Sequence, residues 1–535
     1  MRPVKNTPPS HPARRPLPPL PLLRPLLLLS PLLVLSACGG GGGGSGDGGA
    51  VVVVPTPPVV PPSLRGKLIG TASVVPVSIN GASVDTLEPA VFKQFLDDQQ
   101  RGSSAITGTP SCAVTTYTVR YHTLGSAGED TEASTAIMVP SGGTAGQCGG
   151  ARPVLLYAHG TSVLKATDMS KLSATEPRLI AAMFAAQGYI VVAPNYAGYA
   201  GSTLGYHAYL DAAQQASDMV DGLRAARLSF ATVGAKDGGR LLLTGYSQGG
   251  YVALATQRAM QTGYAGEFNV TAAAGLSGPY ALSLFGDTIF GGAPSSGAAA
   301  FLPMLINAGQ RANAGLYSSS AEVYEAKYAA GIDSLFPGAL GIGDLVAAGQ
   351  LPNDVLFAQD SLPQAAGYAA SFGADHLFKT SYRDGYLADL RANPCNASNA
   401  NPLACAPAHP LRKWLLKNDL RNYVPAAPLL LCGGDQDPVV PYKNAESAYA
   451  YFAAQGKPAG TLDLLNVDAT AGLGDYADTQ LAFGAAKGVL RLSAILEGKS
   501  ASQADQAVRD SYHAGLVAPF CLRATRDFFG RAANR

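Results

Sequence analysis

The chain has 535 residues, of which 14% are charged, and its 38 lysines and arginines almost balance its 37 aspartates and glutamates. A formal net charge of +1, with no basic cluster beyond the N-terminal leader, argues against nucleic acid as a partner and favours an uncharged or apolar substrate. Hydrophobic residues make up 47% of the chain, which is enough to bury a large core.

Residues 1–37 have the pattern of an export signal. A basic lead is followed by a leucine-rich segment, 25–35, that is too short to span a bilayer comfortably. The segment ends in Leu35-Ser36-Ala37-Cys38, which resembles the lipobox of bacterial lipoproteins. The resemblance implies cleavage before Cys38, lipidation of its thiol, and membrane attachment through that lipid only. Because Gly39 replaces the aspartate of inner-membrane retention signals, we expect the outer membrane or cell surface. An ordinary secretory signal is the alternative.

Residues 38–64 predict a tether between this anchor and the rest of the chain. Residues 39–50 are nearly all glycine, and residues 51–62 are rich in valine and proline. Neither composition can bury a core, so we expect a flexible half followed by a stiffer, extended half.

Residues 65–284 predict alternating strands and helices. Two stretches, 115–121 and 131–139, alternate apolar with polar residues, as half-exposed strands do. Continuous apolar runs that predict strands buried on both faces occupy residues 153–158, 189–194, 241–244 and 270–276. Helical patterns separate these runs. This rhythm predicts an α/β protein with a mostly parallel, doubly wound sheet.

The rhythm stops at residue 285 and resumes at residue 416. Residues 285–415 hold short apolar clusters and helical pieces between Gly, Pro and Ser breaks. We interpret this part as an inserted, largely helical lid, with a continuation of the main core as the alternative. Residues 416–535 then complete the sheet, with predicted strands at 428–432 and 462–467.

The most informative motif is Gly245-Tyr246-Ser247-Gln248-Gly249. An apolar run precedes it and a helix-forming stretch follows it. This is the strand, sharp turn and helix of a nucleophile elbow, in which small residues two before and two after the serine make room for the turn. Ser247 is therefore the candidate nucleophile.

The elbow is typical of α/β-hydrolases, in which the triad follows the chain order serine, acid, histidine. His122, His159 and His207 precede Ser247, which excludes them. The other histidines outside the leader are His376 and His409, which fall in the predicted lid, and His513. His513 is therefore the candidate base, in a predicted loop before the final helix.

The acid is expected in the loop after the strand at 428–432. This loop offers Asp435 and Asp437, and we favour Asp437 because the Pro-Val-Val-Pro that follows would hold its loop in one geometry. Asp435 is the alternative. Simple turn chemistry would also account for both aspartates.

Hydrolysis of an acyl group also needs N–H donors for the developing oxyanion. We expect one from the backbone of Gln248, at the start of the elbow helix. The other is expected from Thr161, in the loop after the strand at 153–158. His159, in the same loop, is interpreted as structural.

Six cysteines remain besides Cys38, an even number that predicts disulfides in an exported chain. Six cysteines allow fifteen pairings. Proximity along the chain favours Cys112–Cys148 and Cys395–Cys405, which leaves Cys432–Cys521 as the third pair. No cysteine or histidine cluster suggests a metal, and no cofactor is expected.

From about residue 110 onward these motifs resemble the bacterial secretory lipase/esterase family of α/β-hydrolases. The motifs are His159-Gly160-Thr161, Ala193-Pro194-Asn195-Tyr196, the elbow, Asp437-Pro438-Val439-Val440-Pro441 and His513. The resemblance implies a Ser–Asp–His triad, a lid and hydrolysis of carboxylic esters. Two features depart from the family pattern: Asn195 stands where aspartate is usual, and residues 472–498 look inserted.

The expected function is thus a serine lipase or esterase that acts on a neutral or apolar ester through an acyl-enzyme. Two alternatives stay open: a serine peptidase of the oligopeptidase type, and a catalytically inactive surface binding protein. Acyl-chain length and oligomeric state do not follow from the sequence.

Overall fold

The protein is described by a computed structural model over residues 64–99, 102–143 and 146–532, which belong to one compact unit. The predicted signal segment, Cys38 and all but the last residue of the predicted tether lie outside the described residues. Lipidation of Cys38 therefore stays a prediction. Within the described part of the chain, every helix is too short or too polar to cross a membrane.

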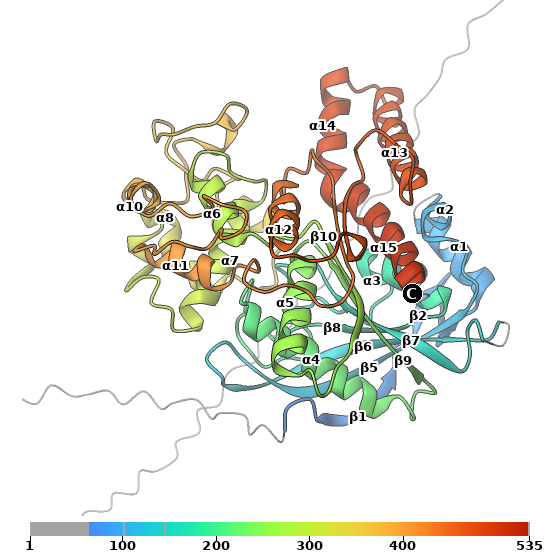
Figure 1. Ribbon diagram of the computed structural model, residues 1–535. Helices are drawn as coiled ribbons and strands as arrows, with labels where there is room; N and C mark the ends of the chain where they lie inside the picture. The colour runs from blue at the N-terminus through green and yellow to red at the C-terminus, as the bar shows by residue number, and fades with distance from the viewer. Residues whose placement is uncertain (1–63, 100–101, 144–145, 533–535) are drawn as a thin grey trace, which may run out of the picture. The chain divides into compact units, whose positions relative to one another are not determined.

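A central sheet of ten strands runs through the body (Figure 1). Its order is β1-β5-β6-β8-β7-β9-β10-β11-β12, with β4 paired to β5. The strands are β1 (Leu68–Val74), β4 (Thr86–Leu87), β5 (Ala113–Leu124), β6 (Asp130–Ser141), β7 (Ala151–Ala158), β8 (Ile190–Pro194), β9 (Lys236–Tyr246), β10 (Val270–Leu276), β11 (Leu429–Gly433) and β12 (Leu462–Asn466). From β8 to β12 all neighbours are parallel, whereas the pairings from β1 to β8 by way of β5 and β6 are antiparallel. The predicted mostly parallel α/β fold is confirmed.

Helices cover both faces of the sheet, which explains why its middle strands are apolar throughout. Along β9, Leu241 and Leu243 point to the cluster that holds α4 (Ala212–Ser229) and α5 (Gln248–Gly263). Leu242, between them, points to the opposite cluster, which holds α3 (Thr175–Met183) and α15 (Ala518–Ala532). Successive side chains of a strand alternate in direction, so a strand covered on both faces needs apolar residues at every position.

Between β10 and β11 the chain forms a cap beside the sheet. Its helices are α6 (Leu282–Phe290), α7 (Ala298–Arg311), α8 (Ala326–Ala329), α9 (Ile342–Ala347), α10 (Thr380–Ala392) and α11 (Pro410–Lys417). The cap is less helical than expected, because residues 348–379 are irregular apart from one 3-10 turn at Ala369–Ser371. Its buried side chains join the same apolar cluster as α4 and α5, so the cap packs directly on the main core.

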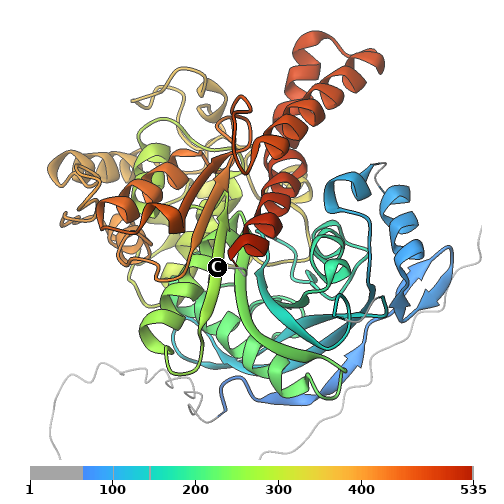
Figure 2. The same ribbon diagram turned by 45° about the vertical axis from the view of Figure 1, so that its right-hand side comes forward.

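The C-terminal part forms a helical hairpin that projects from the body (Figures 1 and 2). Here α12 (Lys443–Ala454) precedes β12, and α13 (Ala477–Leu496) then turns back into α14 (Ala501–Ser511). A π-helical segment, Tyr512–Val517, joins α14 to α15 without a loop. The remaining elements lie near the N-terminus: β2 (Val77–Ile79), β3 (Ala82–Val84), α1 (Pro89–Gln99) and α2 (Ser103–Thr107).

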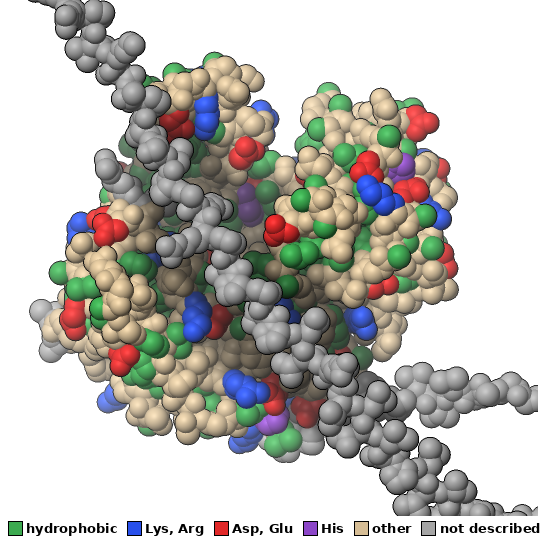
Figure 3. All heavy atoms as spheres, turned by 180° about the vertical axis from the view of Figure 1, so that it is seen from behind, with side chains coloured by type: hydrophobic (Ala, Val, Ile, Leu, Met, Phe, Trp, Pro, Cys, Tyr) green, Lys and Arg blue, Asp and Glu red, His purple; other side chains and the backbone are tan. Residues whose placement is uncertain are grey.

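The three predicted disulfides are confirmed: Cys112–Cys148, Cys395–Cys405 and Cys432–Cys521. The last of these ties the end of β11 to α15 across 89 residues of sequence. On the face seen in Figure 3, acidic and basic side chains are interspersed, as the neutral composition suggests.

Candidate active site

Ser247 occupies the sharp turn between β9 and α5. Its backbone angles are φ 59° and ψ −124°, a conformation that residues other than glycine rarely adopt. The turn is held by the Ser247 N–H, which donates to the Leu276 carbonyl of β10 at 2.8 Å. Strain of this kind persists only where the surrounding structure enforces it, and it is common at active sites.

The glycines of the motif are needed because backbone from β7 crowds the turn. A Cβ on Gly249 would lie 1.9 Å from the Ala158 carbonyl oxygen, and a Cβ on Gly245 would lie 2.5 Å from the same atom. A Cβ on Gly250, the next residue, would lie 2.6 Å from the Leu276 carbonyl oxygen. No larger residue fits at these positions without moving a strand.

Asp437 and His513 meet although 76 residues separate them. The His513 Nδ1 lies 2.7 Å from the Asp437 Oδ2. The other carboxylate oxygen of Asp437 accepts the backbone N–H groups of Val439 and Val440 at 2.9 and 3.1 Å, so the carboxylate is buried and fixed. Asp435, the alternative acid, is exposed and its backbone N–H donates to Asn466. The structure therefore pairs Asp437 with the imidazole.

The His513 ring lies beside the elbow. Its centroid is 4.9 Å from that of Tyr246, the residue before Ser247, and the Tyr246 hydroxyl donates to the His513 carbonyl. Its Nε2 is buried and has no hydrogen-bond partner among the described residues. No hydrogen bond joins it to the Ser247 hydroxyl within the described residues.

The local structure around His513 differs from the sequence expectation. The predicted loop is wrong, because His513 lies in the π-helical segment between α14 and α15. Such segments are rare and are frequent at functional sites. The neighbouring Tyr512 is buried, and its hydroxyl donates to Asp468 at 2.7 Å. This hydrogen bond ties the π-helical segment to the loop after β12.

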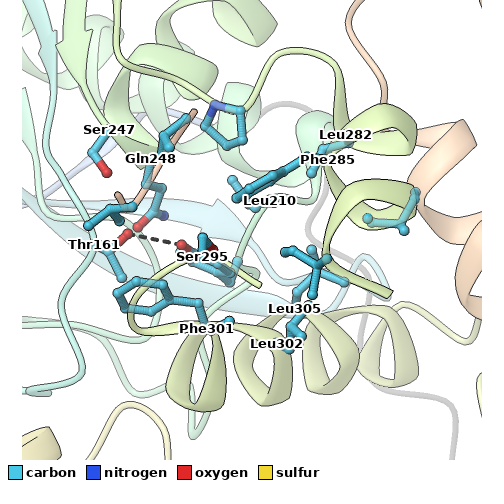
Figure 4. Close-up of a pocket in the computed structure, with 18 residues that line it drawn as sticks. Thr161, Leu210, Ser247, Gln248, Leu282, Phe285, Ser295, Phe301, Leu302 and Leu305 are labelled. Atoms are coloured by element: carbon cyan, nitrogen blue, oxygen red, sulfur yellow. Dashed lines mark hydrogen bonds between the residues drawn. The ribbon is translucent and has the colours of Figure 1, made fainter. Parts of the chain in front are cut away.

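Both expected oxyanion donors lie at the rim of one cavity. Gln248 is the first residue of α5, so its backbone N–H belongs to the free donors of a helix N-terminus. Thr161 follows β7, and its hydroxyl lies 3.0 Å from that of Tyr209. Figure 4 shows Ser247, Gln248 and Thr161 close together at one end of the cavity.

A buried histidine that the chain order had set aside contacts Gln248. The His207 Nε2 lies 2.6 Å from the Gln248 side-chain nitrogen, and its Nδ1 lies 3.2 Å from the Ala197 carbonyl oxygen. Because an amide nitrogen can only donate, Nε2 accepts, Nδ1–H donates to Ala197, and the ring is neutral. Burial lowers the pKa of His207 to about 3. No sequence signal links residues 207 and 248, since only tertiary packing brings them together.

His159 and Asn195 support the loop that carries Thr161. The buried His159 ring stacks on Tyr196 at 4.0 Å, which agrees with a structural role. The Asn195 amide donates to Ser134 and to Asp168 at 2.8 and 3.0 Å, and its oxygen accepts the Met169 N–H. An asparagine can thus sit against Asp168 where a second carboxylate would be repelled.

A cavity beside Ser247, between the sheet and the cap, holds about 550 Å³ of empty space, which includes its opening to solvent. Its wall is almost wholly aliphatic and aromatic, and α6 and α7 contribute Leu282, Phe285, Ile289, Phe301, Leu302 and Leu305 (Figure 4). Val439 and Val440, two and three residues after Asp437, also line it. Among the described residues, no group of three or more His, Cys, Asp or Glu side chains could hold a metal ion.

Comparison with known proteins finds similar lipases and esterases. Residues 166–299 match the family model of the secretory lipases. The chain is similar to the rice cell wall degrading esterase LipA from Xanthomonas oryzae, with 27% identity and a TM-score of 0.59 over 78% of this chain and 94% of LipA. It is also similar to a protein from Legionella pneumophila that is provisionally assigned as a hydrolase, with 20% identity and a TM-score of 0.61 over 88% and 99% of the two chains. No curated protein matches the chain. The match to the LipA structure identifies the fold as that of the α/β-hydrolases, and the Legionella protein shares this fold.

Proposed function

From the match to the secretory lipases, we propose that this protein is an exported serine hydrolase of carboxylic esters. Its nucleophile is Ser247, its base is His513 and its orienting acid is Asp437. The observation that carries the proposal is the buried Asp437–His513 pair, 2.7 Å apart, with a free Nε2 beside the strained elbow. The family match and the likeness to an esterase at 27% identity support the ester bond as the target.

Catalysis follows from the chemistry of these three side chains. The Ser247 oxygen attacks the ester carbonyl carbon while His513 Nε2 takes the hydroxyl proton. Asp437 holds Nδ1 and stabilises the imidazolium that forms. His513 then gives its proton to the departing alcohol oxygen, which leaves an acyl group on Ser247. Water attacks this acyl-enzyme with the same base, and the carboxylic acid is released.

The Gln248 and Thr161 backbone N–H groups stabilise the negative charge on the carbonyl oxygen in each tetrahedral intermediate. Gln248 can do so only if the first turn of α5 stays in place. His207 is a positioning residue in this scheme, because it holds the Gln248 side chain at 2.6 Å.

The cavity favours a neutral, apolar acyl group. Its lining from α6 and α7 holds no charged side chain, so an acyl chain that enters loses water without leaving a charge unpaired. We take residues 285–415 as the lid over this cavity. Attachment to the outer membrane or cell surface through a lipid on Cys38 belongs to the same proposal.

Replacing the nucleophile tests the proposal. We expect Ser247→Ala to lower kcat on nitrophenyl esters by at least about 10⁴-fold, with the fold retained, since triad members act as a unit. A chain-length series of these esters, run on the protein and on the variant, measures the effect and the preferred acyl length. Labelling by a fluorophosphonate that persists in Ser247→Ala would contradict the assignment.

A peptide substrate and the fluorophosphonate separate the alternatives. An oligopeptidase would cleave the peptide as well as esters, and an inactive binding protein would turn over neither and would resist the fluorophosphonate. We expect ester hydrolysis to dominate.

A further inference from the structure

The outer face of α13 carries a row of apolar side chains exposed to solvent. The exposed fractions are 63% for Leu481, 64% for Val489, 55% for Leu492, 38% for Ile495 and 78% for Leu496. Gly484, Ala485 and Gly488 lie between them on the same face. At 100° per residue these eight residues, named here the α13 face, cover an arc of about 140° in which Asp478, in the first turn, is the one charged residue. An arc wider than about 100° is what a helix normally turns toward a core.

The two basic side chains of α13 lie outside this arc and form ion pairs. Lys487 forms an ion pair with Asp468, in the loop after β12, and Arg491 donates to Asp505 of α14 at 2.6 Å. The helix buries Phe483 and Ala494 against the body, so the exposed row is a second apolar face, which an ordinary surface helix lacks. The exposed row is therefore unfavourable in water and indicates an apolar partner.

No described segment of the chain covers this face. A Cβ built on Gly484 or Gly488 would meet nothing within 4 Å. The hairpin of α13 and α14 stands away from the sheet in both ribbon views (Figures 1 and 2). Leu473, just before α13, is fully exposed and extends the apolar surface.

We propose that the α13 face docks on an uncharged lipid surface, with α13 lying flat and its leucines inserted among the acyl chains. The row runs along a helix about 30 Å long, as an interfacial helix requires. Residues 472–511 contain four basic and five acidic side chains, so this part of the chain has no excess of positive charge to select anionic lipids. Charge-independent insertion is the remaining mode.

The hairpin would bring that surface to the candidate site. Because α14 continues directly into the segment that holds His513, a surface bound along α13 lies next to the rim of the site. This consequence rests on the proposed function, since it matters only if Ser247 hydrolyses esters. The docking itself does not depend on catalysis.

Flotation with phosphatidylcholine vesicles tests the docking. The protein used in this experiment starts at residue 39. It lacks the predicted signal and the lipidated cysteine and keeps the whole compact unit from Thr56 to Arg535. It carries Ser247→Ala, so no turnover alters the vesicles. We expect the triple variant Leu481→Ser, Leu492→Ser and Leu496→Ser to lower the vesicle partition coefficient by about 100-fold or more. Neither 1 M salt nor added phosphatidylglycerol should change the binding of the parent much.

A control variant tests whether the loss of binding is specific to the α13 face or would follow from substituting an exposed leucine elsewhere. Leu228 on α4 is 54% exposed, almost the same as Leu492, and α4 lies at the opposite end of the body (Figure 1). Leu228→Ser should leave binding unchanged. Because all substituted side chains are exposed, the thermal unfolding midpoints should agree. With Ser247 intact, the triple variant should still hydrolyse a soluble short-chain ester, which separates failed docking from failed catalysis.

Three results would overturn the proposal. The triple variant could bind the vesicles as well as the parent. Binding could require anionic lipid and disappear in salt, which would indicate a basic site instead. The parent could sediment as a dimer that the triple variant converts to a monomer, which would make a second copy of the chain the occupant of the face.

Discussion

At the scale of single residues, the elbow shows how closely backbone can constrain a side chain. Ser247 is held at a positive φ by a hydrogen bond to β10. Positions 245, 249 and 250 must be glycine because a Cβ at each would clash with the backbone of β7 or β10. The candidate nucleophile is thus placed by backbone packing, before any contact with a catalytic partner is made.

Gly249→Ala should destabilise the protein by about 3 kcal/mol or more and abolish ester hydrolysis. Its Cβ would overlap the Ala158 carbonyl, and a backbone atom in the middle of a sheet has little room to move. Gly263→Ala, at the last residue of the same helix, is the control, because its Cβ meets nothing within 4 Å. It should be neutral or stabilise by up to about 1 kcal/mol. Urea denaturation measures both, and equal losses would contradict the packing argument.

At the scale of secondary-structure elements, the site depends on two segments joined by a disulfide. The strand β11 leads into the loop with Asp437, and α15 follows directly on the segment with His513. Cys432 and Cys521 link these elements and are fully buried. The disulfide therefore fixes the element before Asp437 to the element after His513.

Replacing Cys432 and Cys521 by alanine should cost about 4–5 kcal/mol of stability, because the bridge closes a loop of 89 residues. The same change at Cys395 and Cys405 should cost less, about 3 kcal/mol, because that loop spans 10 residues in the cap. Only the first pair should also lower kcat on a soluble ester. Equal losses of stability and activity from the two double variants, in urea denaturation and steady-state kinetics, would exclude this role.

At the scale of the whole molecule, burial of neutral histidines should make the protein sensitive to acid. The pKa of His207 is lowered to about 3 and that of His409 to about 4, mainly by burial. Between these values and about 6.5 the unfolded chain binds protons that the folded chain does not. The contribution of these two histidines to the free energy of unfolding is therefore complete above about pH 6.5 and is lost as the pH falls. Burial raises the pKa of Asp218 to about 7. This group has the opposite effect, because it lowers the free energy of unfolding as the pH rises toward 7.

Replacing His207 by glutamine should isolate its part of this profile. Glutamine can still accept from Gln248 and donate to Ala197, but it does not titrate. Between pH 6 and pH 4.5 the free energy of unfolding of the parent should fall more steeply than that of His207→Gln, by about 1.4 kcal/mol per pH unit. Urea denaturation at several pH values measures the two slopes. Parallel slopes would show that His207 is not kept neutral by folding.

Several features could be predicted from the sequence because their signals are local. The buried strands are apolar at consecutive positions, since both faces are covered, and the elbow needs small residues at fixed offsets. The disulfide pairs followed from proximity for the two short loops and from elimination for the third. Asp437 was favoured over Asp435 because of the rigid Pro-Val-Val-Pro that follows it, and the structure pairs it with His513.

Other features could not be predicted because they depend on contacts between distant residues. Glycine and alanine near residue 514 favour a loop, yet packing of Tyr512 against the body keeps the chain helical through His513. The contact between His207 and Gln248 has no sequence pattern at all. Residues 472–498 look inserted, but nothing in the local sequence predicts that the α13 face stays exposed to solvent.

The sequence alone therefore determined the fold class, the elbow and the chemical identity of the site residues, because strand periodicity, turn sterics and side-chain chemistry are properties of short segments. Only the tertiary structure decided that His513 lies in a helical segment, which histidine supports Gln248 and which face of α13 remains uncovered. These outcomes depend on how separate elements pack in space, and that packing is set by the whole core at once.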